Sequence, residues 1–159
     1  MKFKLACIVV TSFILSGFFF WNSAQSDTTK ASKNNPDFYF KMGLVEKGRR
    51  LINKLGCNDC HTAGYLKSKG NIPENKWLTG DTIGWRGPQG TSYGSNLRLL
   101  INALKEKEWI KMAKTLKSRP PMPHPILNAM SDEDLGAIYW FIRYLGPSGK
   151  PAPAFKPED

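Results

Sequence analysis

The sequence predicts an all-α domain with a long irregular middle segment, and three observations lead to that prediction. Apolar residues recur at helical spacing within residues 36–56, 96–116 and 131–146. Residues 62–95 contain seven glycines and no alternating strand pattern. The chain has 159 residues, which is enough for one hydrophobic core. A loop this long is uncommon in a compact domain, so we expect something other than its own backbone to order it.

The first predicted helix begins after Asn35, a good N-cap, and ends at Gly56. Its predicted apolar stripe consists of Leu44, Gly48, Leu51 and Leu55. A glycine inside a helix costs about 1 kcal/mol relative to alanine. We therefore expect a second helix to cross closely at Gly48.

Two further helical regions follow the glycine-rich segment. Residues 96–116 are predicted to form two short helices or one bent helix. The last helix is predicted to start at the N-cap Ser131, with Met130 as the preceding staple residue, and to stop at Gly146. Between these regions, residues 119–125 contain four prolines and cannot be helix interior.

The N-terminal segment, residues 1–26, has the pattern of an export signal. Lys2 and Lys4 precede an uncharged apolar run, and small residues stand at Ala24 and Ser26. The run, residues 5–21, approaches the minimum length for spanning a bilayer, so an uncleaved N-terminal anchor is the alternative. Residues 27–35 are interpreted as a polar linker and residues 148–159 as a Pro-rich tail.

The charge of the chain is strongly positive. Without residues 1–26, the chain keeps 21 of its 23 basic residues and all 13 acidic residues, a formal charge of +8. Such a balance favours partners with acidic surfaces. Nucleic acid is the other usual partner of a basic protein, but predicted export and the scattered lysines argue against it.

The string Cys57-Asn58-Asp59-Cys60-His61 carries the chemistry. Two cysteines at this spacing each add to one vinyl group of a haem, and the next residue supplies an imidazole to the iron. CxxCH is the signature of c-type haem attachment.

Three other interpretations of the string fit the sequence less well. A redox dithiol needs a thioredoxin-like βαβ context, which the sequence does not indicate. A disulfide closing so short a loop would stabilise a domain of this size poorly. Zinc would need Cys57, Cys60, His61 and His124 together, and adjacent Cys60 and His61 fit one tetrahedral ion poorly.

A sixth iron ligand is expected, because an iron that only carries electrons has both axial positions filled. A soft thioether stabilises the ferrous state. Among the candidates, Met42 and Met112 are expected on helices, where methionine usually fills the core. Met122 is favoured because Pro121 and Pro123 stiffen its loop. Met130 is the runner-up, and His124 would give bis-histidine ligation instead.

The chain resembles class I c-type cytochromes across residues 37–147. The resemblance rests on a helix before CNDCH, the Pro-flanked Met122 and the closing SDEDLGAIYWFIRYLG, in the family order. The stretch Gly84-Trp85-Arg86-Gly87-Pro88 and the residues after it are similar to the cytochrome domains of periplasmic dehydrogenase complexes. This chain has one CxxCH, whereas the cytochrome subunits of those complexes string several such domains together.

The resemblance implies three to five helices wrapped around one covalent haem c, within a domain spanning residues 36–147. It also implies that the first and last helices cross near Gly48, with Phe141 packed there. Arg86 and Tyr93, and with less weight Asn96, are the residues expected to hydrogen-bond the haem propionates.

The function expected from these features is single-electron transfer, without enzymatic activity, by a periplasmic protein with His61 and Met122 on the iron. The same features also fit two alternative functions. One is a haem subunit docked to a periplasmic dehydrogenase. The other is a haem enzyme or gas sensor with an open sixth position.

Overall fold

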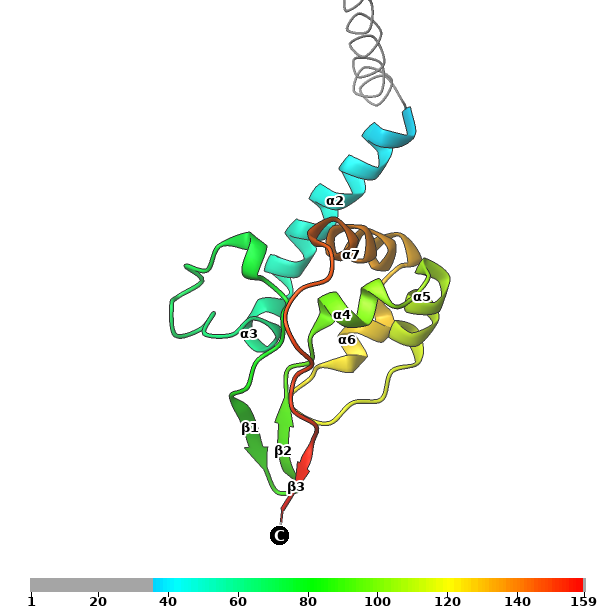
Figure 1. Ribbon diagram of the computed structural model, residues 1–159. Helices are drawn as coiled ribbons and strands as arrows, with labels where there is room; N and C mark the ends of the chain where they lie inside the picture. The colour runs from blue at the N-terminus through cyan, green and yellow to red at the C-terminus, as the bar shows by residue number, and fades with distance from the viewer. Residues whose placement is uncertain (1–35, 159) are drawn as a thin grey trace, which may run out of the picture. The chain divides into compact units, whose positions relative to one another are not determined.

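The computed structural model describes residues 36–158 (Figure 1). Its elements are α2 (Pro36–Lys54), α3 (Cys57–His61), the 3-10 helix η1 (Glu74–Lys76), β1 (Gly84–Gly87), β2 (Gly90–Tyr93), α4 (Leu97–Asn102), α5 (Glu106–Thr115), α6 (His124–Ala129), α7 (Asp132–Leu145) and β3 (Lys156–Pro157). The predicted helical class is confirmed. The described residues hold six α-helices, rather than three to five, because α3 and α6 are short additional helices.

The predicted export signal or anchor and the linker fall on residues outside this range. Among the helices of residues 36–158, none combines the length and the hydropathy that a membrane span requires.

Helices α2 and α7 cross at Gly48, as expected. A Cβ atom added to Gly48 would collide with the Ala137 carbonyl and would lie 2.7 Å from the Phe141 Cβ. The buried residues of α2 are Val45, Gly48 and Ile52. Of the predicted stripe, Gly48 is buried and Leu51 packs against the core, whereas Leu55 lies beyond the end of the helix and is 36% exposed.

Helix α7 forms the centre of the core. Its predicted cap is confirmed: the Asp134 backbone N–H donates to the Ser131 hydroxyl over 3.1 Å. The indole Nε1 of the buried Trp109, on α5, donates to the Leu135 carbonyl over 2.9 Å. The first bond satisfies a backbone N–H that would otherwise be free at the start of α7, and the second ties α5 to the first turn of α7.

The glycine-rich segment contains a β-hairpin that the sequence interpretation missed. Strands β1 and β2 pair antiparallel from Gly84↔Tyr93 to Gly87↔Gly90, and β3 adds to β2 as the third strand. Figure 1 shows the C-terminal segment running past α4 to reach this edge of the hairpin. Most of residues 62–83 is irregular, as predicted.

Two polar residues at the start of α4 hold the C-terminal region in place. The Asn96 side-chain amide donates to the carbonyls of Ser148 over 2.8 Å and Lys150 over 3.1 Å. Its oxygen accepts from the Leu99 backbone N–H and caps α4. The buried Arg98 guanidinium donates to backbone carbonyls at Leu145, Gly146 and Asn75. Loss of solvent lowers the pKa of Arg98 from its ordinary value.

Candidate functional site

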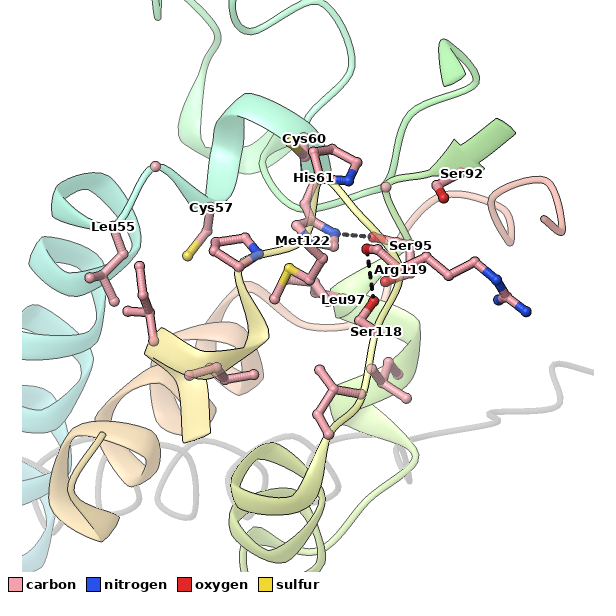
Figure 2. A pocket seen from close by; sticks show the side chains of 18 of the residues that line it. Leu55, Cys57, Cys60, His61, Ser92, Ser95, Leu97, Ser118, Arg119 and Met122 are labelled. Carbon is pink, nitrogen blue, oxygen red and sulfur yellow. Dashed lines mark hydrogen bonds between the residues drawn. The ribbon is translucent and has the colours of Figure 1, made fainter. Parts of the chain in front are cut away.

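A cavity of about 670 Å³ lies beside α3 and contains the residues of the CxxCH motif. This volume is within the range of cofactor sites. The walls come from the end of α2, the hairpin, helices α4 to α7, the segment that leads into α6 and the C-terminal segment. Most of the wall residues are apolar. Figure 2 draws the residues around this space. The side chains that bear chemistry on it are those of Cys57, Cys60, His61, Tyr93, Lys117, Arg119 and Met122.

The two cysteines reach the cavity because Gly56 separates α2 from α3. Gly56 has a φ of 67°, a backbone conformation that glycine adopts without strain, and α3 begins at the next residue. Cys57 and Cys60 are three residues apart on this short helix, so both thiols face the same space.

Both thiols are free. Burial raises the pKa of the Cys57 thiol to about 11, and burial also raises the pKa of Cys60. Catalytic redox dithiols need the opposite, a lowered pKa that exposes a thiolate. The environment of these cysteines therefore does not favour thiol exchange.

The imidazole of His61 is held in the tautomer that a metal ligand requires. Its Nδ1 lies 2.7 Å from the Ser95 carbonyl oxygen. Because a carbonyl only accepts, Nδ1 carries the hydrogen and Nε2 keeps its lone pair. Burial lowers the pKa of His61, which favours the neutral ring.

The backbone at Gly94 lies directly against α3 and brings the Ser95 carbonyl to His61. A Cβ atom added to Gly94 would collide with the Cys60 carbonyl. Sequence interpretation missed both residues. The signal in the sequence was a glycine between two polar residues, which also fits an ordinary turn.

Three buried hydrogen bonds fix α3 to the middle segment. The Thr62 hydroxyl donates to the Asn58 side-chain oxygen, and the Leu78 backbone N–H donates to the Thr62 hydroxyl, each over 2.7 Å. The Gly80 backbone N–H donates to the His61 carbonyl over 2.8 Å. The irregular segment therefore supports the motif from one side without regular secondary structure.

Three of the four candidate methionines, Met112, Met122 and Met130, line the cavity, and Met42 does not. Met112 and Met130 pack against the hydrophobic core. Met122 lies outside that packing, on the non-helical turn before α6, and Figure 2 draws its thioether beside His61. Of the three sulfurs, that of Met122 is the one least engaged elsewhere.

His124, the alternative ligand, is the first residue of α6 and is not among the residues that line the cavity. Its backbone N–H donates to the Met122 carbonyl over 2.9 Å. Its Nδ1 is buried and has no hydrogen-bond partner among the described residues.

The zinc interpretation also lacks support, since no group of three or more His, Cys, Asp and Glu side chains in residues 36–158 could hold a metal ion.

The residues expected to bind propionates are separated in the structure. Tyr93 lines the cavity. Arg86 does not: its side chain is 77% exposed and pairs with the Glu158 carboxylate. Asn96 is buried in its contacts to the C-terminal segment.

The cavity wall contains two cations that the sequence interpretation missed, Lys117 and Arg119, and no carboxylate. Together with two thiols, an imidazole nitrogen, a thioether and apolar walls, this set fits haem, whose propionates are anionic. The residues present therefore satisfy the chemistry of a covalent haem site.

The helical fold and this arrangement of thiols and imidazole define a haem protein of the c type. The family model described as Cytochrome c matches residues 45–146, which is more than half of the chain. The chain belongs to the cytochrome c family, as a class I c-type cytochrome, and its cofactor is one covalently bound haem c. It is a haem-based electron carrier. Searches of the curated proteins and of the solved structures found no match.

Proposed function

We propose that this cytochrome is a periplasmic single-electron carrier whose haem iron is ligated by His61 and Met122. The observation that carries the proposal is one cavity lined by Cys57, Cys60, His61 and Met122, with the His61 Nδ1 tied to a carbonyl. Predicted export supports the periplasmic location, because covalent attachment keeps haem from being lost outside the cytoplasm.

The protein residues determine how the site works. Haem c supplies a one-electron ferric–ferrous couple when it is bound. The Ser95 carbonyl orients the His61 ring and makes it a more basic ligand. The soft thioether of Met122 favours the ferrous state, and apolar walls such as Ile52 and Ile138 exclude water. His61 and Met122 would both be ligands of the iron and would leave no position on it for a substrate, so the proposed role is electron transfer rather than catalysis.

The proposed docking face is the rim where the cavity opens to solvent. Three apolar residues line the cavity and are also solvent-exposed: Leu55 by 36%, Trp85 by 42% and Ile126 by 55%. Lys54 directly precedes Leu55 at the end of α2, and Lys117 lies on the cavity wall. An electron partner with an apolar contact surrounded by acidic residues complements this rim.

The ligand assignment is tested by the absorption spectrum of purified holoprotein in three forms: wild type, Met122→Ala and Met130→Ala. We expect the methionine–iron charge-transfer band to disappear in Met122→Ala only, with a lower reduction potential. Met130→Ala is the matched control, because Met130 lines the same cavity but packs against the core. Loss of the band in Met130→Ala, with retention in Met122→Ala, would assign the ligand to Met130.

Carbon monoxide separates a carrier from a haem enzyme or sensor. The wild-type ferrous protein should remain unreactive, and Met122→Ala should bind the gas. Avid binding by the wild type would mean an open sixth position. Constant co-purification with a larger flavin or quinone dehydrogenase would instead favour a docked haem subunit.

A further inference from the structure

The C-terminal residues 147–158 lie beyond the part of the chain that the family model matches. They nevertheless contribute to the haem cavity. Phe155 lines the main cavity and also a second cavity of about 260 Å³ next to it. The wall between the two cavities thus includes a side chain that the family match does not account for.

This segment is fixed along its length. The Asn96 amide holds the carbonyls of Ser148 and Lys150, and β3 pairs with β2 at Gly90↔Pro157 and Thr91↔Lys156. Gly90 has a φ of 125°, and a Cβ atom there would collide with the Lys156 carbonyl. Gly90 thus lets β3 approach the hairpin closely. Phe155 lies between this strand and the carbonyls that Asn96 holds, so the chain is anchored on both sides of it.

Phe155 contacts one residue of the loop that precedes Met122. The guanidinium carbon of Arg119 lies 4.0 Å from the centroid of the Phe155 ring. Arg119, like Phe155, lines both cavities. When an arginine stacks on an aromatic face, the ring occupies one face of the guanidinium. The N–H groups at its edge stay free to donate to a carboxylate.

Arg119 has no carboxylate partner within residues 36–158. Arg86 pairs with Glu158, and Arg49 pairs with Glu46 and Glu74. The main cavity has no acidic wall residue that could serve Arg119. Arg119 is an exposed residue, and its side chain extends away from His61 and Met122 (Figure 2), so its guanidinium lies at the solvent-facing edge of the cavity. A stacked guanidinium without an internal acceptor at this edge is suited to an anionic group at the outer end of the molecule that fills the cavity.

We propose that Arg119 binds a propionate carboxylate of the haem and that Phe155, delivered by the C-terminal segment, is its positioning residue. This inference rests on the proposed haem site and extends it to the anionic end of the cofactor. It assigns to Arg119 the role that the sequence interpretation gave to Arg86.

The test is the reduction potential of purified holoprotein, measured by mediated redox titration. Arg119→Gln should lower the potential, because a cation beside a propionate opposes the additional positive charge of the ferric haem. Two controls remove the same charge outside the main cavity. Arg50→Gln lies on the exposed face of α2, and Arg86→Gln changes a side chain that lines only the second cavity and pairs with Glu158. Both controls should shift the potential much less than Arg119→Gln.

The role of Phe155 is tested in a double-mutant cycle. Phe155→Leu keeps an apolar side chain but removes the aromatic face, and it should lower the potential in the same direction as Arg119→Gln. Phe155→Tyr should retain the wild-type potential. In the Arg119→Gln background, Phe155→Leu should add little, because Phe155 acts through Arg119.

Equal shifts in Arg119→Gln and Arg50→Gln, or strictly additive shifts in the cycle, would overturn the proposal. A larger shift in Arg86→Gln would return the propionate role to Arg86. These outcomes are distinct from failure of the haem site itself, which would appear as wild-type protein without covalent haem in its pyridine haemochrome spectrum.

Discussion

At the scale of single residues, the reactive groups were predictable from the sequence, but the hydrogen-bond partners that orient them were not. Cys57, Cys60 and His61 are adjacent in sequence, and their spacing carries the chemistry without any tertiary information. The Ser95 carbonyl, which sets the tautomer of His61, lies 34 positions further along the chain. A backbone carbonyl has no residue-type signature, so only the structure reveals this partner.

Gly48 is the residue at which a methyl group should disturb the fold most clearly. In Gly48→Ala, the new Cβ would meet the Ala137 carbonyl on α7, and we expect the free energy of unfolding to fall by about 1–3 kcal/mol. Gly43→Ala, on the same helix, has nothing within 4 Å of its new Cβ. It should raise the free energy of unfolding by about 0.5–1 kcal/mol through helix propensity.

Guanidinium denaturation of the two holoproteins, followed by far-UV circular dichroism, measures both values. If Gly48→Ala were as stable as Gly43→Ala, the close crossing of α2 and α7 would be wrong.

At the scale of elements, the long helices were predictable and the short elements were not. Helix α7 has a cap, a staple residue and a stop signal in its sequence. Helix α6 was missed because its prolines suggested a loop, although Pro125 is tolerated in the first helical turn. Strand β3 has two residues and pairs with a strand more than sixty positions earlier, so no local pattern marks it.

The contact between α2 and the start of α7 includes an ion pair whose contribution should depend on pH. Lys47 Nζ lies 2.8 Å from the Asp134 carboxylate and 2.7 Å from that of Glu133. The hydrogen bond from Lys47 lowers the pKa of Asp134. A lowered carboxyl pKa stabilises the fold above the unfolded pKa, and this stabilisation is lost as pH falls through the lower, folded value.

Lys47→Met should therefore lower Tm relative to wild type at about pH 6, and the difference should shrink at about pH 2.5, below the ordinary carboxyl pKa of about 3.9. Lys67→Met is the control, because Lys67 has no carboxylate partner among the described residues. Scanning calorimetry at both pH values measures the effect. A Tm difference that stays constant with pH would show that Lys47 acts through packing rather than charge.

At the scale of the whole molecule, the sequence predicted the family and the cofactor, but not how the chain closes the cavity. The order of CNDCH, the Pro-flanked Met122 and the final helix is enough to indicate a class I cytochrome. The contribution of the C-terminal segment depends on Phe155 and Arg119 meeting across 36 positions. That contact follows from β3 pairing with the hairpin, which was not predictable.

The excess of basic residues gives the whole protein a long-range field. The sequence as a whole carries a formal charge of +10. We expect the second-order rate of electron transfer with an acidic redox protein to fall as ionic strength rises, because salt shortens the Debye length to about 8 Å at 0.15 M. Stopped-flow kinetics with an acidic copper protein, and with a basic one as the control, measures this dependence. A rate that does not change with salt would mean that the positive charge of the protein does not steer its partner.

Covalent attachment of haem is tested most directly by the mass of the purified protein made in a host that attaches haem c. We predict the mass of the polypeptide plus one haem, with the haem recovered on a single peptide that contains Cys57 and Cys60. A colourless protein with the mass of the polypeptide alone would contradict the account at its centre.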